Sequence, residues 1–484
     1  MIITDEIRAQ YKPTIGIECH VQLKTKTKLF APVDNDARES EPNTKVSAIC
    51  LGLPGVLPVL NKSAVDLAIR AGRALNATIN THSSFDRKHY FYPDLPKGYQ
   101  ITQFQAPIVG EGAVVVPTEK GSITVRITRA HLEEDAGKST HPSGADYSLV
   151  DLNRVGTPLL EIVSEPDMHS PAEARAFAHE LYLLMKYADV SEADLFHGNM
   201  RFDVNVSLAP VDSNELGLRA EVKNINSFRS VERAVEYEIK RQIELLEKGQ
   251  TIVQETRGWD EDKGKTISQR SKENAHDYRY FPDPDIPPVL LTQQYIDNAV
   301  SNMPTLPQEY RSEFTTIGLT PSVTESLLEN PEETQLIHDV HATYGLENAR
   351  QIALWIVNVL RADQNDLTVK NTPDTRDRLQ KLAAMVEANE LSSTAAKEVF
   401  LTVVANGSDP RKVAEQSGLL QNSNADDIAI YVQEAIAANP KAAEDVTNGE
   451  MKAIGFLVGQ IMKKSKGQAN PSLVTQEIKK QLGA

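Results

Sequence analysis

The chain contains only two cysteines among its 484 residues, Cys19 and Cys50. So few thiols exclude a disulfide-stapled scaffold and any zinc site built on a C-x-x-C pair. The sequence also lacks a run of about 20 apolar residues, the length that spans a bilayer. Residues 1–12 are polar and mixed in charge, without the apolar core of a signal peptide. These absences predict a cytoplasmic protein with no membrane partner.

Positive charge is also scarce, because 51 Lys and Arg stand against 67 Asp and Glu, a formal net charge of −16. Such an acidic balance argues against a surface that binds nucleic acid as a whole, and no DNA partner is expected. It leaves room for a local basic patch. Hydrophobic residues at 40% and charged residues at 24% are ordinary for a globular protein. At about 150 residues per domain, the length predicts two to four domains.

The usual nucleotide-binding and hydrolase motifs are missing. Residues 136–140 read Ala-Gly-Lys-Ser-Thr, but a P-loop needs glycine where this chain has Leu132, and an acidic triplet fills the loop. The sequence contains no Rossmann glycine fingerprint, no H-E-x-x-H pair and no G-x-S-x-G elbow. Any use of a nucleotide must therefore rest on metal ions and basic side chains.

The pattern of the chain predicts an α+β fold with three domains. Residues up to about 290 are rich in strands, with alternating segments at 14–23, 122–129, 159–163, 200–208 and 217–223. Two helices interrupt them: one is capped by Ser170 with proline next, and the other follows Ser227 and runs to about Lys248. Beyond a proline-rich stretch at 281–288 the pattern becomes helical. We expect domains at residues 1–295, 296–407 and 408–484.

The first alternating segment separates apolar from polar side chains. Cys19 lies on its apolar face and is read as a core residue, whereas Glu18 and His20 share the polar face. A glutamate and a histidine two residues apart on a strand can converge on one ion. The alternative is a face that is merely solvated, and this segment alone leaves both interpretations open.

A second polar face recurs later in the chain. Arg201 and Asp203 alternate with apolar residues in 200–208, Glu221 and Lys223 do so in 218–223, and the two segments are predicted to pair as an antiparallel hairpin. Carboxylates with arginine and lysine suit a site for Mg²⁺ and phosphate, because Mg²⁺ takes oxygen ligands and basic side chains pair with phosphate. Glu161 lies within an apolar run, where an unpaired carboxylate would be costly, so we expect a cation beside it.

Basic and aromatic residues are interleaved in two loops, and basic residues recur in the last helices. The loops span residues 87–100 and 270–281, and this composition suits a nucleotide or an RNA end through stacking and phosphate contact. Residues 451–484 contain six lysines and a single glutamate, with glycines at 455, 459 and 467 that allow close backbone approach. Loops packed by their own tyrosines and a solvated basic helix are the competing interpretations.

Taken together, these segments resemble the B subunit of the tRNA-dependent amidotransferases that act on Asp-tRNA(Asn) and Glu-tRNA(Gln), the GatB family. The resemblance covers the chain from end to end, and many long motifs occur in the right order. The motifs are IGIECHVQLKTKTKLF (15–30), PGVLPVLN (54–61), FDRKHYFYPDLPKGYQIT (85–102), ITRAHLEEDAGKS (127–139), SLVDLNRVGTPLLEIVSEPD (148–167), MRFDVNVSL (200–208), EVKNINSFR (221–229) and DYRYFPDPDIPP (277–288).

The resemblance implies one member of a heterotrimeric enzyme. The chain would use ATP and Mg²⁺ to phosphorylate the side-chain carboxylate of a misacylated tRNA. Ammonia released from glutamine by an amidase partner (the A subunit), in a complex with a small third partner (the C subunit), would then displace the phosphate. The resemblance also implies a first domain similar to the glutamine synthetase and guanido kinase fold, and a helical tail that binds the tRNA.

Carried over residue by residue, the resemblance implies two metal-binding sets and a group of substrate contacts. Glu133 could exchange roles with Glu134, because the sequence leaves the strand register open. His197 stands where the family often has glutamate. The implied metal ligands are Glu18, His20, Glu134 and Glu161, with Asp203 and Glu221 for a second ion; the implied catalytic contacts are Arg201, Lys223, Asn224 and Ser227; and the implied nucleotide contacts are Lys88, Tyr90, Arg201 and Lys223.

Two other functions fit part of the pattern. A free-standing ligase on a small carboxylic acid would explain the acidic faces but has no need of the basic tail. A non-catalytic tRNA-binding scaffold would explain the tail but leaves Glu161 and the Glu18/His20 face without a purpose.

Overall fold

The computed structural model divides the chain into two compact units, Met1–Leu306 and Pro307–Ala484. Each unit is described by itself. The residues that the structure describes are 3–271, 278–362, 367–421, 425–450, 452–465 and 468–483, with the side chains at 270 and 271 excepted.

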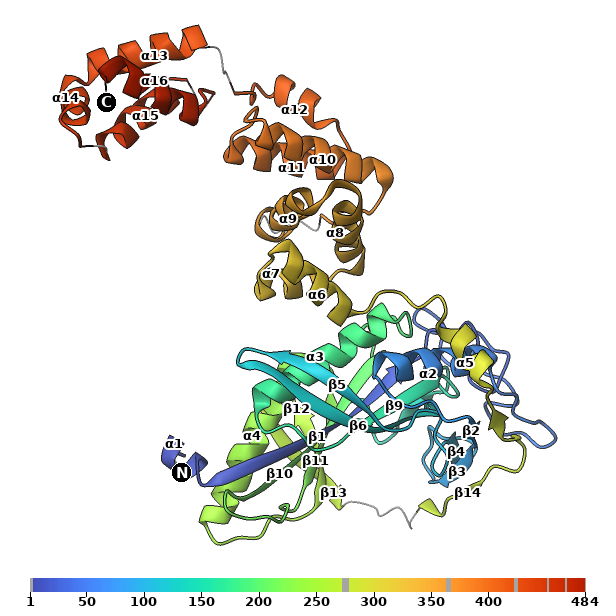
Figure 1. The fold of residues 1–484 in the computed structure, drawn as a ribbon. Coiled ribbons are helices and arrows are strands. Elements are labelled where there is room, and N and C mark those ends of the chain that lie inside the picture. The colour runs from blue at the N-terminus through green and yellow to red at the C-terminus, as the bar shows by residue number, and fades with distance from the viewer. Residues whose placement is uncertain are drawn as a thin grey trace. The chain divides into compact units, whose positions relative to one another are not determined.

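The first unit is built on one large sheet of 11 strands among the described residues. Its long central strand, β1 (Tyr11–Gln22), pairs antiparallel with β10 (Met200–Pro210) on one side and β9 (Pro158–Ser164) on the other. The full order is β13-β12-β11-β10-β1-β9-β6-β4-β3-β14, with β5 paired to β6, and the β11–β12 pair is parallel. The predicted β10–β11 hairpin is confirmed. The sheet therefore brings segments that lie between Tyr11 and Pro282 in the sequence side by side (Figure 1).

The remaining elements of the first unit complete this sheet and cover it. The strands are β2 (His82–Ser83), β3 (Asp86–His89), β4 (Tyr99–Thr102), β5 (Gly112–Thr118), β6 (Gly121–Glu134), β7 (Lys138–Thr140), β8 (Leu149–Asp151), β11 (Ala220–Ile225), β12 (Glu255–Asp260), β13 (Lys265–Ser271), β14 (Phe281–Pro282) and β15 (Val289–Leu290), and the helices are α1 (Asp5–Arg8), α2 (Lys62–Ala74), α3 (Pro171–Tyr187), α4 (Phe228–Glu247) and α5 (Gln293–Val300).

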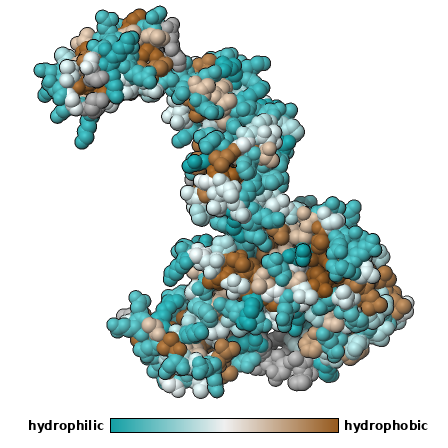
Figure 2. All heavy atoms as spheres, in the orientation of Figure 1, coloured by the Kyte–Doolittle hydropathy of each residue, from teal (hydrophilic) through white to brown (hydrophobic). Residues whose placement is uncertain are grey.

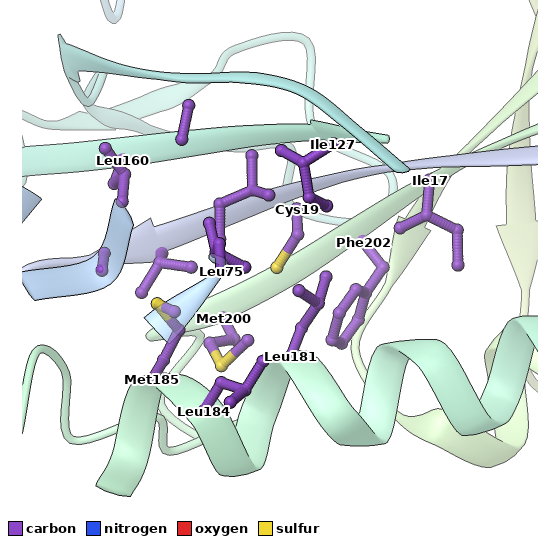
Figure 3. Close-up of a cluster of buried hydrophobic side chains, with 14 of the residues drawn as sticks. Ile17, Cys19, Leu75, Ile127, Leu160, Leu181, Leu184, Met185, Met200 and Phe202 are labelled. Atoms are coloured by element: carbon purple, nitrogen blue, oxygen red, sulfur yellow. The ribbon is translucent and has the colours of Figure 1, made fainter. Parts of the chain in front are cut away.

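One face of the sheet forms the core of the first unit. Helices α3 and α4 pack against each other and against β1 and β10 (Figure 1). Figure 3 shows Cys19, Phe202 and Ile127 pointing from three strands toward α3. Both predicted helix starts are confirmed, since Ser170 Oγ accepts from the backbone N–H of Glu173, and Ser227 caps α4 in the same way. With this face covered, the polar residues of the strands are left on the other.

The second unit consists of short helices, many of which begin with proline at the first or second position. This placement costs nothing, because the first N–H groups of a helix have no partner within it. Its elements are α6 (Pro307–Ile317), α7 (Pro321–Leu328), α8 (Pro331–Tyr344), α9 (Leu346–Trp355), the π-helix η2 (Ile356–Leu360), α10 (Pro373–Glu387), α11 (Ser393–Asn406), α12 (Pro410–Gln416), α13 (Ala425–Ala438), α14 (Pro440–Thr447), α15 (Lys452–Lys464) and α16 (Pro471–Leu482).

The last four helices have an apolar core of their own. Ile428, Val446, Leu457 and Ile478, one from each helix, belong to this buried cluster. The helices α13 to α16 therefore form a small module within the second unit.

The α+β prediction is confirmed in its coarse form, a large sheet with helices followed by an all-helical region. No described helix has both the length and the apolar character needed to cross a membrane. In the view of Figure 2, apolar residues appear as patches among hydrophilic ones.

Candidate functional site

The polar face of the sheet carries a row of chemically active side chains in register. His20 on β1 lies opposite Arg201 on β10 and opposite Glu161 on β9, and Glu161 in turn lies opposite His131 on β6. Paired residues of neighbouring strands point to the same face of a sheet. Four consecutive strands thus place a guanidinium, two imidazoles and a carboxylate next to one another.

His20, Glu133 and Glu161 form the first acidic cluster. One ligand atom of each lies within 4.8 Å of the other two. His20 Nε2 is 3.6 Å from a Glu161 carboxylate oxygen and 3.8 Å from one of Glu133. The sequence predicts that His20 and Glu161 lie together, and the structure does bring them together.

His131 lies at the edge of the first cluster and was not anticipated. Its Nε2 is 3.3 Å from a Glu161 oxygen and 3.8 Å from one of Glu133. Burial lowers the pKa of His131, but the charge of Glu161 and hydrogen bonds to Glu133 and Glu161 outweigh burial and raise that pKa to about 9. The pKa of Glu161 is correspondingly held well below its ordinary value, against the effect of burial, chiefly by His131. Without a bound ion, a protonated His131 thus offsets part of the negative charge.

Glu18, Asp203 and Glu221 form the second acidic cluster, again with ligand atoms within 4.8 Å of one another. They come from β1, β10 and β11. Lys223 lies between two of them, with its Nζ 2.7 Å from Asp203 Oδ2 and 3.2 Å from Glu221 Oε1. The hairpin alternation predicted Asp203, Glu221 and Lys223 on one face, and they do converge.

The second cluster is strongly negative around the ammonium of Lys223. Burial raises the pKa of Glu18, and the neighbouring carboxylates of Glu161, Glu221 and Asp203 raise it further. Burial alone would lower the pKa of Lys223, but the charges of Asp203 and Glu221 raise it above the ordinary lysine value. Lys223 is therefore a firmly charged internal counter-ion.

Glu134 lies away from both clusters. Its carboxylate pairs with Lys97 and accepts a hydrogen bond of 3.0 Å from the backbone N–H of Ile101. Glu133, its neighbour, is the residue that reaches His20 and Glu161. The sequence left open which of the two glutamates is the ligand. Glu133 therefore replaces Glu134 among the candidate ligands, and Glu134 forms an ion pair with Lys97 instead.

A β-bulge in β6 decides which glutamate faces the site. Pairing with β9 shifts between Ile127 and Arg129, so that Thr128 is an extra residue. Before the bulge, Val125 and Ile127 face the core; after it, Ala130 and Leu132 do. Bulges of this kind re-aim the side chains that follow them.

Arg201 pairs with Asp135, the last residue of the acidic triplet, for which the sequence predicted no individual role. The Asp135 carboxylate is 3.0 Å from Arg201 and 3.3 Å from Arg154, and it accepts a longer hydrogen bond of 3.4 Å from Gln22. Burial would raise the pKa of Asp135, but the two guanidinium groups hold it below its ordinary value. Arg201 is thus fixed beside the first cluster by an ion pair.

Lys88 lies close to the first cluster beneath aromatic rings. Its Nζ is 4.7 Å from the ring centre of Tyr278 and 5.8 Å from that of Tyr90. Burial lowers the pKa of Lys88, but nearby charges, Glu133 first among them, raise it overall. Burial also raises the pKa of the Tyr90 hydroxyl, which therefore stays neutral.

Three residues singled out in the sequence lie outside the clusters. Asn224 is exposed with a φ of 66°, and the Ser227 hydroxyl caps α4 rather than binding a cluster residue. His197 is 3.8 Å from Asp194 in an exposed turn. The basic loop residues at 272–277 lie outside the described residues.

A cleft of about 430 Å³ opens beside the second cluster. It is lined in part by Glu18, Asn205, Ser207 and Arg219. The Asn205 amide donates a hydrogen bond of 3.0 Å to Glu18. A substrate in this cleft would lie against Glu18, one member of the second cluster.

Both clusters offer the ligands that a small divalent cation needs. Mg²⁺ binds through a few carboxylates and completes its shell with water or phosphate oxygen. The first cluster adds an imidazole, a ligand that softer divalent cations also accept. Three carboxylates without an ion would repel one another. In the second cluster, the ammonium of Lys223 neutralises only part of their negative charge.

Comparison with known proteins places these residues in a family context. A family model described as the GatB/GatE catalytic domain matches residues 13–297, and one described as the GatB domain matches residues 340–482. The first of these ranges contains both clusters.

Curated relatives match over nearly the whole chain. Proteins from Carboxydothermus hydrogenoformans, Persephonella marina and Halorhodospira halophila are 42%, 43% and 46% identical, each across 98% of this chain and 99% to 100% of their own length. All three are named as the B subunit of an aspartyl/glutamyl-tRNA(Asn/Gln) amidotransferase. A solved tRNA-binding domain of yeast glutaminyl-tRNA synthetase covers 37% of this chain and 96% of its own, but with 16% identity and a TM-score of 0.20 it carries no argument.

Proposed function

The chain belongs to the family of aspartyl/glutamyl-tRNA(Asn/Gln) amidotransferase B subunits, and from this premise we propose how it works. It uses ATP to activate the side-chain carboxylate of Glu-tRNA(Gln) or Asp-tRNA(Asn), and ammonia then converts the activated group to the amide. The observation that carries the proposal is the pair of acidic clusters in neighbouring rows of one sheet face, with Arg201, Lys88 and Lys223 among them.

The reaction needs positioning and charge neutralisation more than a protein nucleophile. A carboxylate is a poor acyl donor to ammonia, because the leaving group would be oxide. In the proposed first step a carboxylate oxygen of the substrate attacks the γ-phosphorus and ADP leaves. In the second step ammonia attacks the acyl carbon and inorganic phosphate leaves.

The side chains of this face suit those steps. We assign His20, Glu133 and Glu161 to one ion and Glu18, Asp203 and Glu221 to a second; bound Mg²⁺ would supply Lewis-acid neutralisation of phosphate charge. Arg201, held by Asp135, and Lys88, beneath its tyrosines, would orient and neutralise the transferred phosphoryl group. Tyr90 limits water around Lys88.

The second ion must compete with Lys223, whose ammonium already lies between Asp203 and Glu221. Lys223→Met removes this competitor and keeps most of the length of the side chain. We expect the wild-type complex to bind one Mn²⁺ tightly, and the variant to bind a second at least tenfold more tightly than wild type does. Counting bound Mn²⁺ by electron paramagnetic resonance checks this. Two equally tight ions in the wild type would contradict it, and so would a variant that gains none.

The partners and the division of labour belong to the same proposal. An amidase partner, the A subunit, would release ammonia from glutamine, and a small C subunit would complete the heterotrimer. Within this chain, residues 1–295 would be catalytic, 296–407 a helical domain, and 408–484 the tRNA-binding tail. The large, mostly antiparallel sheet with helices on its covered face supports a catalytic domain similar to glutamine synthetase.

The proposed function is tested by what stimulates ATP hydrolysis in the assembled complex. We expect Glu-tRNA(Gln) or Asp-tRNA(Asn) to raise the rate of ADP release at least tenfold, and uncharged tRNA to leave it near the basal rate, because only the acylated tRNA supplies the accepting carboxylate. Stimulation by free glutamate or aspartate instead would favour the small-molecule ligase. Tight binding of tRNA without any hydrolysis would favour a scaffold.

A further inference from the structure

Arg154 is a second cation beside Asp135, and the proposed reaction gives it no role. It lies in the turn between β8 and β9, and its Nε is 3.3 Å from Asp135 Oδ2, the same oxygen that Arg201 contacts at 3.0 Å. One carboxylate is thus shared by two guanidinium groups. Two positive charges stand against one negative charge, so part of the charge of the two arginines is left without a counter-ion.

Arg154 is also held by the backbone. Its Nε donates a hydrogen bond of 2.9 Å to the carbonyl oxygen of Ala136, and its Nη2 donates one of 2.7 Å to that of Gly137. Neither bond involves Arg201. The guanidinium of Arg154 is therefore kept beside Asp135 independently of what Arg201 binds.

Arg201, in contrast, is fixed through Asp135. Its Nη2 donates a hydrogen bond of 3.0 Å to Asp135 Oδ2, and its guanidinium makes no other hydrogen bond to a residue that the structure describes. Its side chain is 31% exposed. The remaining donors of Arg201 can therefore reach an anion, as its proposed contact with the phosphoryl group requires.

The sharing of Asp135 decides how strongly Arg201 is held. In a site of low dielectric, an isolated pair of a carboxylate and a guanidinium neutralises both charges, and the carboxylate then competes with any phosphate that approaches the guanidinium. Arg154 takes up part of the negative charge of Asp135, so Arg201 is oriented without being neutralised. Gln22 contacts the same oxygen at 3.4 Å, but its amide is uncharged and cannot replace Arg154 in this respect.

We propose that Arg154 is a positioning residue, which acts through Asp135 to keep the guanidinium of Arg201 oriented and charged toward the transferred phosphoryl group. This inference rests on the proposed function and deepens it, because it adds a residue that need not touch the substrate. Preorganised positive charge is most effective where negative charge develops in the transition state. Loss of Arg154 should therefore lower kcat rather than raise KM.

The competing interpretation is structural, with Arg154 only holding the turn through the carbonyls of Ala136 and Gly137. A structural role needs the two donors that reach these carbonyls, whereas the proposed role needs the positive charge beside Asp135. Two substitutions separate these properties. Arg154→Lys keeps the charge but lacks the planar fork of donors, and Arg154→Gln removes the charge.

The test follows ADP release by the assembled complex in the presence of saturating Glu-tRNA(Gln) or Asp-tRNA(Asn). We expect Arg154→Gln to lower kcat about tenfold, equal to about 1.4 kcal/mol in the barrier, and to change the KM for ATP by less than about twofold. Arg154→Lys should keep kcat within about threefold of wild type but unfold at a lower temperature, because the charge remains and the backbone bonds are weakened. Arg126→Gln, which removes an exposed arginine paired with Asp167 on β6, is the matched control and should react normally.

A double-mutant cycle with Asp135→Asn tests whether Arg154 acts through Asp135. With Asp135→Asn already present, we expect Arg154→Gln to change kcat less than about twofold, because the shared negative charge is gone. A tenfold loss in both backgrounds would mean that Arg154 acts on the substrate directly, and it would overturn the inference. A normal kcat in Arg154→Gln would overturn it too, as would equal slowing by Arg154→Lys and Arg154→Gln. If acylated tRNA fails to stimulate even the wild-type complex, the proposed function fails together with this inference.

Discussion

Glu133→Gln is expected to lower amide formation about 10³-fold while its neighbour Glu134→Gln leaves the ion site intact. Glu133 contributes one of the two carboxylates of the first cluster, and glutamine keeps the shape but removes the charge. A metal ligand supplies several kcal/mol of charge stabilisation, and about 4 kcal/mol corresponds to about 10³ in rate. Transamidation kinetics and Mn²⁺ binding measure the two effects, and we expect Mn²⁺ affinity to fall at least tenfold.

Glu134→Gln is the matched control, because it makes the same chemical change one residue away. Its carboxylate pairs with the nearly buried Lys97, and removing one partner of a buried ion pair costs about 3–5 kcal/mol. We therefore expect a lower thermal unfolding temperature with normal Mn²⁺ binding. Loss of Mn²⁺ in Glu134→Gln together with retention in Glu133→Gln would contradict the assignment and restore the interpretation first carried over from the family.

Replacing Lys452, Lys463 and Lys479 together by glutamine is expected to weaken tRNA binding by the complex about 10²-fold at moderate salt. All three lie in the last two helices, α15 and α16. Each lysine–phosphate contact adds about 0.7 to 0.9 to the slope of log affinity against log salt, so the slope should fall by about 2. Filter binding over a range of salt concentrations measures both quantities.

The exposed face of α15 explains why we place the RNA there. Gly455 and Gly459 have nothing within 4 Å of an added Cβ, and Phe456 is 51% exposed beside them. Lys452 and Lys463 lie near the two ends of this helix. Gly459→Leu should therefore raise helix propensity yet weaken tRNA binding by blocking the approach of the RNA backbone.

Matched measurements separate RNA contact from catalysis. Saturating acylated tRNA should restore the rate of the triple lysine variant to that of wild type, since the clusters are untouched. Lys441→Gln, in α14 and outside the lysine-rich stretch, should bind tRNA normally. An unchanged salt slope in the triple variant would place the RNA contacts elsewhere.

Simple alternation was enough to predict several parts of the catalytic sheet. Glu18 and His20 share a face because side chains alternate along a strand, and Asp203 with Lys223 follow from the hairpin in the same way. The cap at Ser170 was readable because Ser-Pro is a strong start signal for a helix. These features depend on local chemistry, which the sequence states directly.

The other parts of the site could not be predicted, because they depend on pairing between distant strands. The bulge at Thr128 leaves no local mark, so continuing the alternation from Val125 would have placed Glu134 rather than Glu133 with the polar residues. His131 was missed for the same reason. Glu134 pairs with Lys97 because the order of the strands brings their two segments together. Neither segment alone indicates this contact.

Because of the bulge, the side chains that β6 presents to the first cluster depend on the number of residues in this strand. Any residue at position 128 that tolerates the bulge keeps the later side chains of β6 on their present faces of the sheet. Deleting Thr128 would turn Arg129, His131 and Glu133 toward the core and present Leu132 to the first cluster. We therefore expect a substitution at position 128 to be far better tolerated than an insertion or a deletion there. The number of residues in β6, more than the identity of residue 128, decides which side chains face the clusters.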